Sequence, residues 1–175
     1  MQNLLNQLLH KWRYENIAFE NGESIDQIVR LEKEIGYLFP LEFKDYLKTV
    51  NGMCEGESDK DLFYFWSSKL IISEVREFKP AGPDSIFIGF ADRIVIDSVY
   101  MIEVFKSSKM TGRVAIKKKN LQIIAPNFQT FLSGYLNNLG KQLSRWEKAS
   151  DNEGIVSQFS LFFENLIPSQ LATAT

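Results

Sequence analysis

Residues 25–52 constrain the fold most strongly, because they read as two short amphipathic helices joined at a proline. Ser24 and Gln27 have the spacing of a capping box, in which each side chain bonds the other residue's backbone N–H at a helix start. Apolar residues then recur at helical spacing, at Ile25, Ile28, Leu31 and Ile35 and again at Phe43, Tyr46, Leu47 and Val50. Gly36 predicts the end of the first helix, and Pro40 suits the first position of the second. An Asn-Gly pair then lets the chain turn sharply away from the second helix.

Outside residues 25–52, the spacing of apolar residues predicts a helix first, then a series of strands, and then helices again. Residues 1–14 have a helical apolar face, which we expect to pack on the chain's own domain, with a partner-binding helix as the alternative. Short apolar runs predict strands at 62–66, 86–89, 94–96, 99–105, 114–116 and 121–124, with a short strand or a bridge between elements at 70–72 and a turn or loop at 79–84. Helical spacing returns over 128–139 and again over 156–166. Because the connections between strands are too short for crossover helices, the sheet is expected to be antiparallel and the fold class α+β.

The paired helices carry a motif that resembles the opening of the SMI1/KNR4 family of the SUKH superfamily. In this chain the motif consists of Ile28, Leu31, Glu32, Ile35, Gly36, Phe39, Pro40, Phe43, Tyr46, Leu47, Asn51 and Gly52. Residues 88–92 are similar to the family's glycine-containing turn, and residues 124–132 to the start of its final helix. The resemblance implies an SMI1/KNR4-like fold, in which helices from the N- and C-terminal parts flank an antiparallel sheet.

We expect three parts along the chain. Its length of 175 residues suits one domain with a sizeable core and additions at its ends. The resemblance defines a core domain over residues 24–140. Residues 1–23 are then an N-terminal helical extension, and residues 141–175 are a C-terminal helical extension and tail.

Composition and charge narrow the classes of function. The net charge of -2 means that the chain lacks the excess of positive charge typical of proteins that bind nucleic acids directly. A single cysteine, Cys54, excludes an internal disulfide and a multi-cysteine zinc site, which favours a reducing cytoplasm. The N-terminus lacks the pattern of a signal peptide, and no apolar run is long enough to predict a membrane span.

Catalytic arrangements are not recognisable in the sequence, so we expect no enzyme activity, no cofactor and no metal site. His10 is the only histidine, and it lies far in sequence from Cys54, so a nucleophile–base pair is a weak alternative. Four carboxylates lie in or beside the strand region, at Asp84, Asp92, Asp97 and Glu103. A pair of them would suit glycoside hydrolysis, but their spacing selects no pair, and water-facing turn and edge positions explain them better.

An acidic loop beside an aromatic strand is the best candidate for partner binding. The candidate residues are Glu55, Glu57, Asp59, Asp61, Tyr64 and Trp66. Aromatic anchors surrounded by charge are typical of tight interfaces, although most of these aromatic residues also suit a core. We expect reversal of Glu55, Glu57 and Asp59 to lysine to weaken a complex with little loss of folding. Several lysines and Arg113 lie in a later hairpin. Their charges are explained by a sheet edge that must avoid pairing with other chains.

For function, the resemblance implies a non-catalytic immunity protein. Such a protein neutralises a cognate polymorphic toxin, often a nuclease, by blocking its active site. The alternative implied by other relatives is a regulatory or scaffold protein of cell-wall synthesis or signalling. The expected partner is therefore a protein toxin rather than a nucleic acid or a membrane, and a homodimer is also compatible with the sequence.

Overall fold

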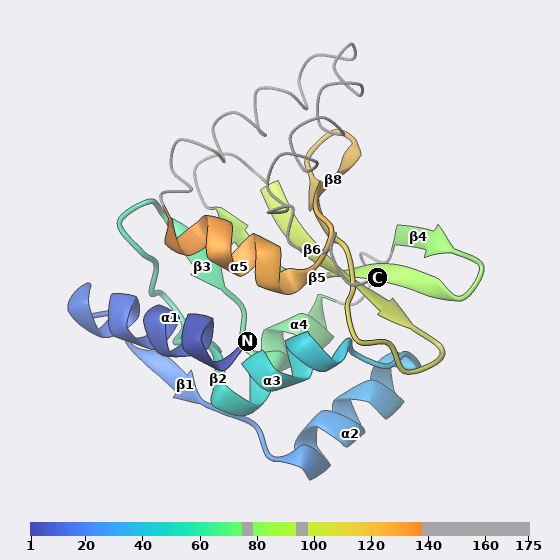
Figure 1. Ribbon diagram of the computed structural model, residues 1–175, viewed down its shortest axis with the longest axis horizontal. Helices are drawn as coiled ribbons and strands as arrows, with labels where there is room; N and C mark the ends of the chain where they lie inside the picture. Colours follow the sequence, from blue (N-terminus) through green and yellow to red (C-terminus); the bar gives the residue numbers. More distant parts are fainter. Residues whose placement is uncertain (75–78, 94–97, 138–175) are drawn as a thin grey trace, which may run out of the picture.

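A computed structural model of the chain describes residues 1–74, 79–93 and 98–137, and these form helices packed on one larger and one smaller sheet (Figure 1). In chain order the elements are α1 Gln2–Tyr14, β1 Phe19–Asn21, α2 Ile25–Ile35, α3 Leu41–Thr49, β2 Val50–Met53, β3 Phe63–Phe65, α4 Ser68–Ser73, β4 Lys79–Gly82, β5 Ser85–Arg93, β6 Ser98–Phe105, β7 Val114–Lys117, β8 Leu121–Ala125 and α5 Phe128–Leu136. This mixture of helices and antiparallel strands confirms the predicted α+β class.

The larger sheet has the strand order β3-β5-β6-β7-β8, and all of its pairings are antiparallel, as predicted. Strand β5 is its longest strand and pairs with β6 along its length. On the other edge of β5, β4 pairs near residues 85–87 and β3 pairs near residues 91–93. The smaller sheet consists of β1 and β2. Strand β3 therefore joins the larger sheet directly after the loop that leaves the smaller one.

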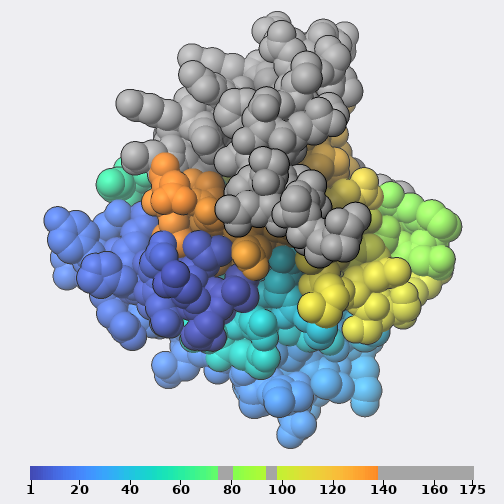
Figure 2. Space-filling view, in the orientation of Figure 1, coloured from blue at the N-terminus to red at the C-terminus, as the bar shows by residue number. Residues whose placement is uncertain are grey.

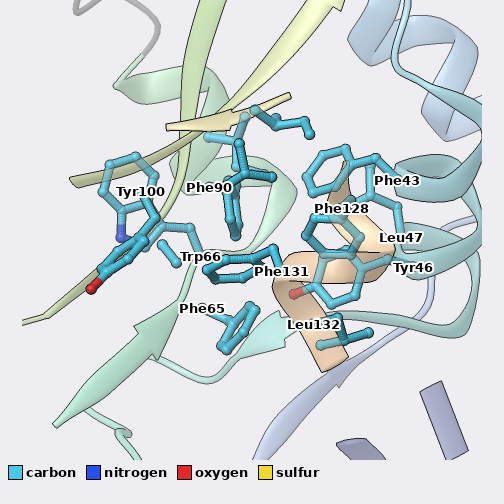
Figure 3. Packing of buried hydrophobic residues seen from close by; sticks show 14 of the residues in the cluster. Phe43, Tyr46, Leu47, Phe65, Trp66, Phe90, Tyr100, Phe128, Phe131 and Leu132 are labelled. Carbon is cyan, nitrogen blue, oxygen red and sulfur yellow. The ribbon is translucent and has the colours of Figure 1, made fainter. Parts of the chain in front are cut away.

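The core lies on one face of the larger sheet and is dominated by aromatic rings. Helices α1, α3 and α5 lie over this face, and they contribute Trp12, Phe43 and Phe131 to one cluster with Phe65 and Phe90 of the strands. Figure 3 shows the side chains of α3 and α5 meeting those of β3 and β5 in this cluster. The ring pairs are mostly tilted or edge-on, the arrangements that aromatic quadrupoles favour.

The helix signals in the sequence act largely as expected. Ser24 and Gln27 form the predicted capping box, Gly36 ends α2 in the left-handed conformation, and the Asn127 side chain caps α5. Pro40 lies one position earlier than predicted, at the N-cap of α3 rather than at its first residue. Ile25 was expected on the buried face of α2, but it is the first residue of the helix and its side chain is 69% exposed.

Two predictions in the middle of the chain are wrong. Residues 70–72 were expected to form a short strand or a bridge between elements, but they belong to the helix α4, because the Ser67 side chain caps a helix start by accepting a bond from the Leu70 N–H. Residues 79–84 were expected to form only a turn, but residues 79–82 pair with β5 as β4. The predicted strand at 94–96 and the helical segments from residue 138 onward lie outside the described residues.

Helix α1 packs on its own domain, as we expected. Leu5, Leu8 and Trp12 are buried in the main core cluster. The Trp12 indole donates a hydrogen bond of 3.2 Å to the Tyr135 hydroxyl on α5. Figure 2 shows the side chains of α1 directly beside those of α5, although the two helices lie at opposite ends of the described chain. The apolar face of α1 is thus satisfied within the chain and does not need a partner.

Candidate binding surface

The loop between β2 and β3, residues 54–62, is organised by the buried carboxylate of Asp59. Asp59 is only 2% exposed, although it stands in an acidic and otherwise polar run. Its Oδ1 accepts the backbone N–H groups of Asp61 and Phe63, each at 2.9 Å. Its Oδ2 accepts hydrogen bonds from the Lys11 ammonium at 3.1 Å and from the Tyr135 hydroxyl at 2.8 Å. A charge buried this deeply needs such partners, and here they also determine the shape of the loop.

Asp59 is therefore internal, and its carboxylate has no free face to offer a partner. This corrects the expectation that lysine at this position would leave folding intact. A lysine there would place a second ammonium group next to Lys11 inside the protein and would remove the acceptor for two backbone N–H groups. The part of the acidic loop that can meet another molecule is smaller than the sequence pattern indicated.

Trp66 is also largely internal, at 6% exposed. Its ring lies against Gly89 of β5, where a Cβ atom would come within 2.3 Å of the ring. The indole N–H donates to the Asp92 carboxylate at 2.5 Å. Burial raises the pKa of Asp92, and the bond from Trp66 opposes that rise. Trp66 thus anchors the segment after β3 to β5, with little surface left for a partner.

Acidic residues from three parts of the chain lie near enough to Tyr64 to affect its phenol. Glu55 is exposed, whereas Glu57 and Tyr64 are half-buried. Burial raises the pKa of the Tyr64 phenol, and negative charge on Asp92, Glu55 and Glu20 raises it further. These carboxylates come from β1, β5 and the loop, so the tertiary structure brings them near one aromatic residue. We call Glu20, Glu55, Tyr64 and Asp92 the acidic surface.

The acidic surface includes residues that our sequence reasoning did not assign to binding. Glu20 was not considered, and Asp92 was considered only as one of several strand carboxylates. Glu20 is the exposed middle residue of β1, but a strand of three residues gives too little alternation to be recognised in a sequence. Asp92 reaches Tyr64 because β3 and β5 pair in the register Tyr64↔Asp92, which only the folded sheet defines.

Cys54 lies beside this surface in an unreactive environment. Its Sγ is 3.8 Å from Glu20 Oε1. Burial, followed by the charges of Glu20 and Glu57, raises the pKa of the thiol. Reactive cysteines need positive surroundings that stabilise the thiolate, so the negative charge here disfavours nucleophilic chemistry.

Leu62, at the end of the loop, is an apolar residue in an unusual conformation. Its φ is +61°, in the left-handed region, and its side chain is 40% exposed. Side chains with a Cβ raise the energy of this region by about 1–2 kcal/mol, so glycine or asparagine is the usual occupant. The geometry is imposed from both sides, since the Leu62 N–H donates to the Asp59 carbonyl and the Phe63 N–H donates to the Asp59 carboxylate.

Two of the other carboxylates considered as catalytic pairs, Glu103 and Asp84, have separate partners. Glu103 forms a two-point ion pair with Arg113, at 2.7 and 2.8 Å, and this pairing lowers the pKa of Glu103 against the opposing effect of burial. Asp84 is exposed and lies 3.4 Å from Lys106, while Asp97 falls outside the described residues. Within the described ranges, no three His, Cys, Asp or Glu side chains are grouped to hold a metal ion. No helix in those ranges combines the length and apolar character of a membrane span.

The sequence profile of the SMI1 / KNR4 family (SUKH-1) matches residues 22–134, more than half of the chain. The chain belongs to this family. Among curated proteins, no relative matches it. The match confirms the resemblance carried by the paired helices, and the observed sheet with its flanking helices is consistent with an SMI1/KNR4-like fold.

The SMI1/KNR4 motif residues with polar side chains support the fold in this chain. Glu32 is buried and accepts the Phe39 N–H and the Lys44 ammonium, both at 2.7 Å. Asn51 accepts the Ser68 N–H through its carbonyl oxygen and donates to Glu23 through its amide nitrogen. The family motif therefore holds α2, α3, β2 and α4 together, and the acidic surface lies outside it.

Proposed function

We propose that this SMI1/KNR4 domain is a non-catalytic immunity protein that binds a cognate polymorphic toxin and blocks its active site. Family membership supports the proposal, because members of this family generally act by binding toxins. The protein would act in the cytoplasm of the cell that makes it, where a toxin reaches its substrate. It would need neither a cofactor nor direct contact with nucleic acid.

The observation that carries the proposal is the acidic surface around Tyr64. Glu20, Glu55 and Asp92 place negative charge around a ring that is partly accessible. A nuclease, as one toxin class, binds phosphate through basic groups, so a rigid acidic surface is complementary to its active site. An aromatic residue within a charged rim is also the usual composition of an interface centre.

Co-expression tests this proposal. Cells that produce the toxin encoded by the neighbouring open reading frame are expected to survive when they also produce this protein. The two purified proteins are expected to form a complex that isothermal titration calorimetry detects. Cell death despite co-expression, with no complex at micromolar concentration, would argue against an immunity function.

The location of the interface is tested by reversing one surface charge. We expect Glu55→Lys to weaken the complex about tenfold or more and to slow association, because a charge that guides the encounter is inverted. Glu34→Lys is the matched control, since Glu34 is exposed on α2 and gives the same change in net charge away from the acidic surface. Equal loss of affinity in both variants would indicate general electrostatics, and no loss in either would place the interface elsewhere.

A further inference from the structure

We infer that residues 1–21 determine which partner the domain binds, because they supply one part of the acidic surface and hold another part in place. This inference rests on the proposed function and adds to it the residues that set partner specificity. The family profile matches residues 22–134, so this segment precedes the matched region. On a shared fold, function is set by sites that are added to the common scaffold, and this segment is such an addition.

The segment contributes directly to the acidic surface through Glu20, the exposed middle residue of β1. Glu20 Oε1 lies 3.8 Å from the Sγ of Cys54, at the start of the loop between β2 and β3. Cys54 also donates its backbone N–H to the Ala18 carbonyl at 3.0 Å, which fixes β1 against the loop. On the other side, the ring centroids of Trp12 and Phe19 are 5.8 Å apart. Glu20 is therefore held between α1 and the loop.

The segment also anchors the loop itself, residues 54–62, through the last turn of α1. The Lys11 ammonium lies 2.9 Å from the Glu15 carboxylate and 3.1 Å from the Asp59 carboxylate. Glu15 in turn accepts the backbone N–H of Lys60 at 3.4 Å. The side chain of Lys11 is 18% exposed and that of Asp59 is fully buried, so salt screens this ion pair little. Figure 1 shows α1, β1 and this loop on the same side of the molecule.

The polar contacts of α1 hold the loop rather than the helix. Helix α1 is already attached to the core by its buried apolar residues. The bonds of Lys11 and Glu15 therefore act mainly on the loop, which carries Glu55 of the acidic surface. A loop that is fixed before binding loses little conformational freedom in a complex, and a fixed charge guides association. Lys11 is thus a positioning residue for Glu55.

The test of Lys11 uses two matched substitutions in the full-length protein. Lys11→Met keeps an unbranched side chain and removes the ammonium group from the buried carboxylate of Asp59. Lys44→Met is the control, because it removes an ammonium group from the buried carboxylate of Glu32, 2.7 Å away and inside the matched region. Both variants therefore lose an ion pair of the same kind, but only the first loses it at the loop.

Hydrogen exchange measures the position of the loop without a partner. The amides of Asp61 and Phe63 donate to Asp59, so they report whether the loop is closed. Relative to amides of β6 in the same variant, we expect them to exchange about tenfold faster in Lys11→Met. In Lys44→Met the same ratio is expected to stay within about twofold of the wild type.

Affinity for the toxin of the neighbouring open reading frame measures the effect on binding. We expect Lys11→Met to lower it about tenfold or more and Lys44→Met to change it less than about twofold. Glu55→Lys is expected to weaken binding less in the Lys11→Met background than in the wild type, because the released loop no longer holds residue 55 toward the partner. A purely structural role of Lys11 would not produce this coupling.

Glu20 is tested by charge reversal. Glu20→Lys changes an exposed residue, so we expect the stability of the protein to be unchanged and the affinity to fall about tenfold or more. Glu34→Lys is the control, since it makes the same change at an exposed position inside the matched region. If Lys11→Met does not fold, the comparison of Glu20→Lys with Glu34→Lys decides the inference, and equal affinities overturn it.

The remaining outcomes are also distinct. Equal changes of exchange and affinity in Lys11→Met and Lys44→Met would show that Lys11 only stabilises the fold, and they would overturn the inference. If the wild type binds and either Lys11→Met or Glu20→Lys binds equally well, the inference is overturned while the proposed function stands. If the wild type does not bind the toxin, the proposed function fails and the inference fails with it.

Discussion

At the scale of single residues, two left-handed glycines of similar φ have very different surroundings. Gly52 has φ +76°, and a Cβ added there would lie 2.4 Å from the carbonyl oxygen of Trp66. Gly56 has φ +85°, and a Cβ there would meet nothing within 4 Å. The first glycine is thus required by both conformation and space, whereas the second is required by conformation alone. The difference arises because β2 passes close to the backbone that follows β3.

We therefore predict that Gly52→Ala lowers the free energy of unfolding by about 2–5 kcal/mol, the sum of left-handed strain and overpacking against backbone. Gly56→Ala, the matched control, should lower it by only about 1–2 kcal/mol, from strain alone. Urea titrations of both variants, followed by circular dichroism, measure the two values. Equal values would mean that the backbone around Trp66 can move away without a penalty.

At the scale of elements, Asp59 connects segments that are remote in sequence. It bonds Lys11 of α1, Tyr135 of α5 and the backbone that leads into β3. The network continues to the core through the bond from Trp12 to Tyr135. The position of the loop, and with it the acidic surface, therefore depends on the attachment of α1 and α5.

Asp59→Ala is expected to lower the free energy of unfolding by about 3–5 kcal/mol, because it leaves the Tyr135 hydroxyl and two backbone N–H groups without their buried acceptor, while Lys11 keeps its ion pair with Glu15. Glu55→Ala, in the same loop but exposed, should stay within about 0.5 kcal/mol of the wild type. Chemical denaturation monitored by tryptophan fluorescence measures both. A small effect of Asp59→Ala would show that water replaces the carboxylate in this site.

At the scale of the whole molecule, two buried tyrosines of the aromatic core make the protein less stable at alkaline pH. Burial raises the pKa of the Tyr46 phenol. Burial, and then the negative charge of Asp59, raise the pKa of the Tyr135 phenol. In the unfolded chain these phenols lose their protons near pH 10, the ordinary value, so deprotonation favours unfolding above that pH. Their contribution to stability is therefore complete below about pH 10 and is lost as pH rises above it.

We predict that the free energy of unfolding falls above about pH 10 by about 1.4 kcal/mol per pH unit for each buried phenol. Tyr46→Phe should make this decline shallower by one phenol's share, because the ring stays in the core without a group that ionises. Tyr14→Phe is the control and should leave the curve unchanged, since that side chain is 83% exposed. Urea midpoints measured between pH 8 and pH 11 test this, and identical slopes in all three proteins would contradict it.

Local signals in the sequence predicted the helices well but did not predict which acidic residues are buried. The capping box at Ser24, the stop at Gly36 and the cap at Asn127 act within a few residues, so the sequence reveals them directly. Residues 70–72 were misread because three apolar residues suit a strand or a helix equally, and the Ser67 cap decided the outcome. Asp59 was misread because an acidic residue in a polar loop is usually exposed, and its partners Lys11 and Tyr135 are distant in sequence.

The sequence by itself determined the α+β class, the antiparallel sheet, the paired helices and the family, because each depends on periodicity and on turn or cap residues that are close together in the chain. Only the tertiary structure decided which charges are buried and which are free. The register that places Asp92 beside Tyr64, the closure of the loop by Asp59 and the exposure of Leu62 all depend on contacts between distant segments. Burial and partner distance control the free energy of a charge, and neither is a property of the residue type alone.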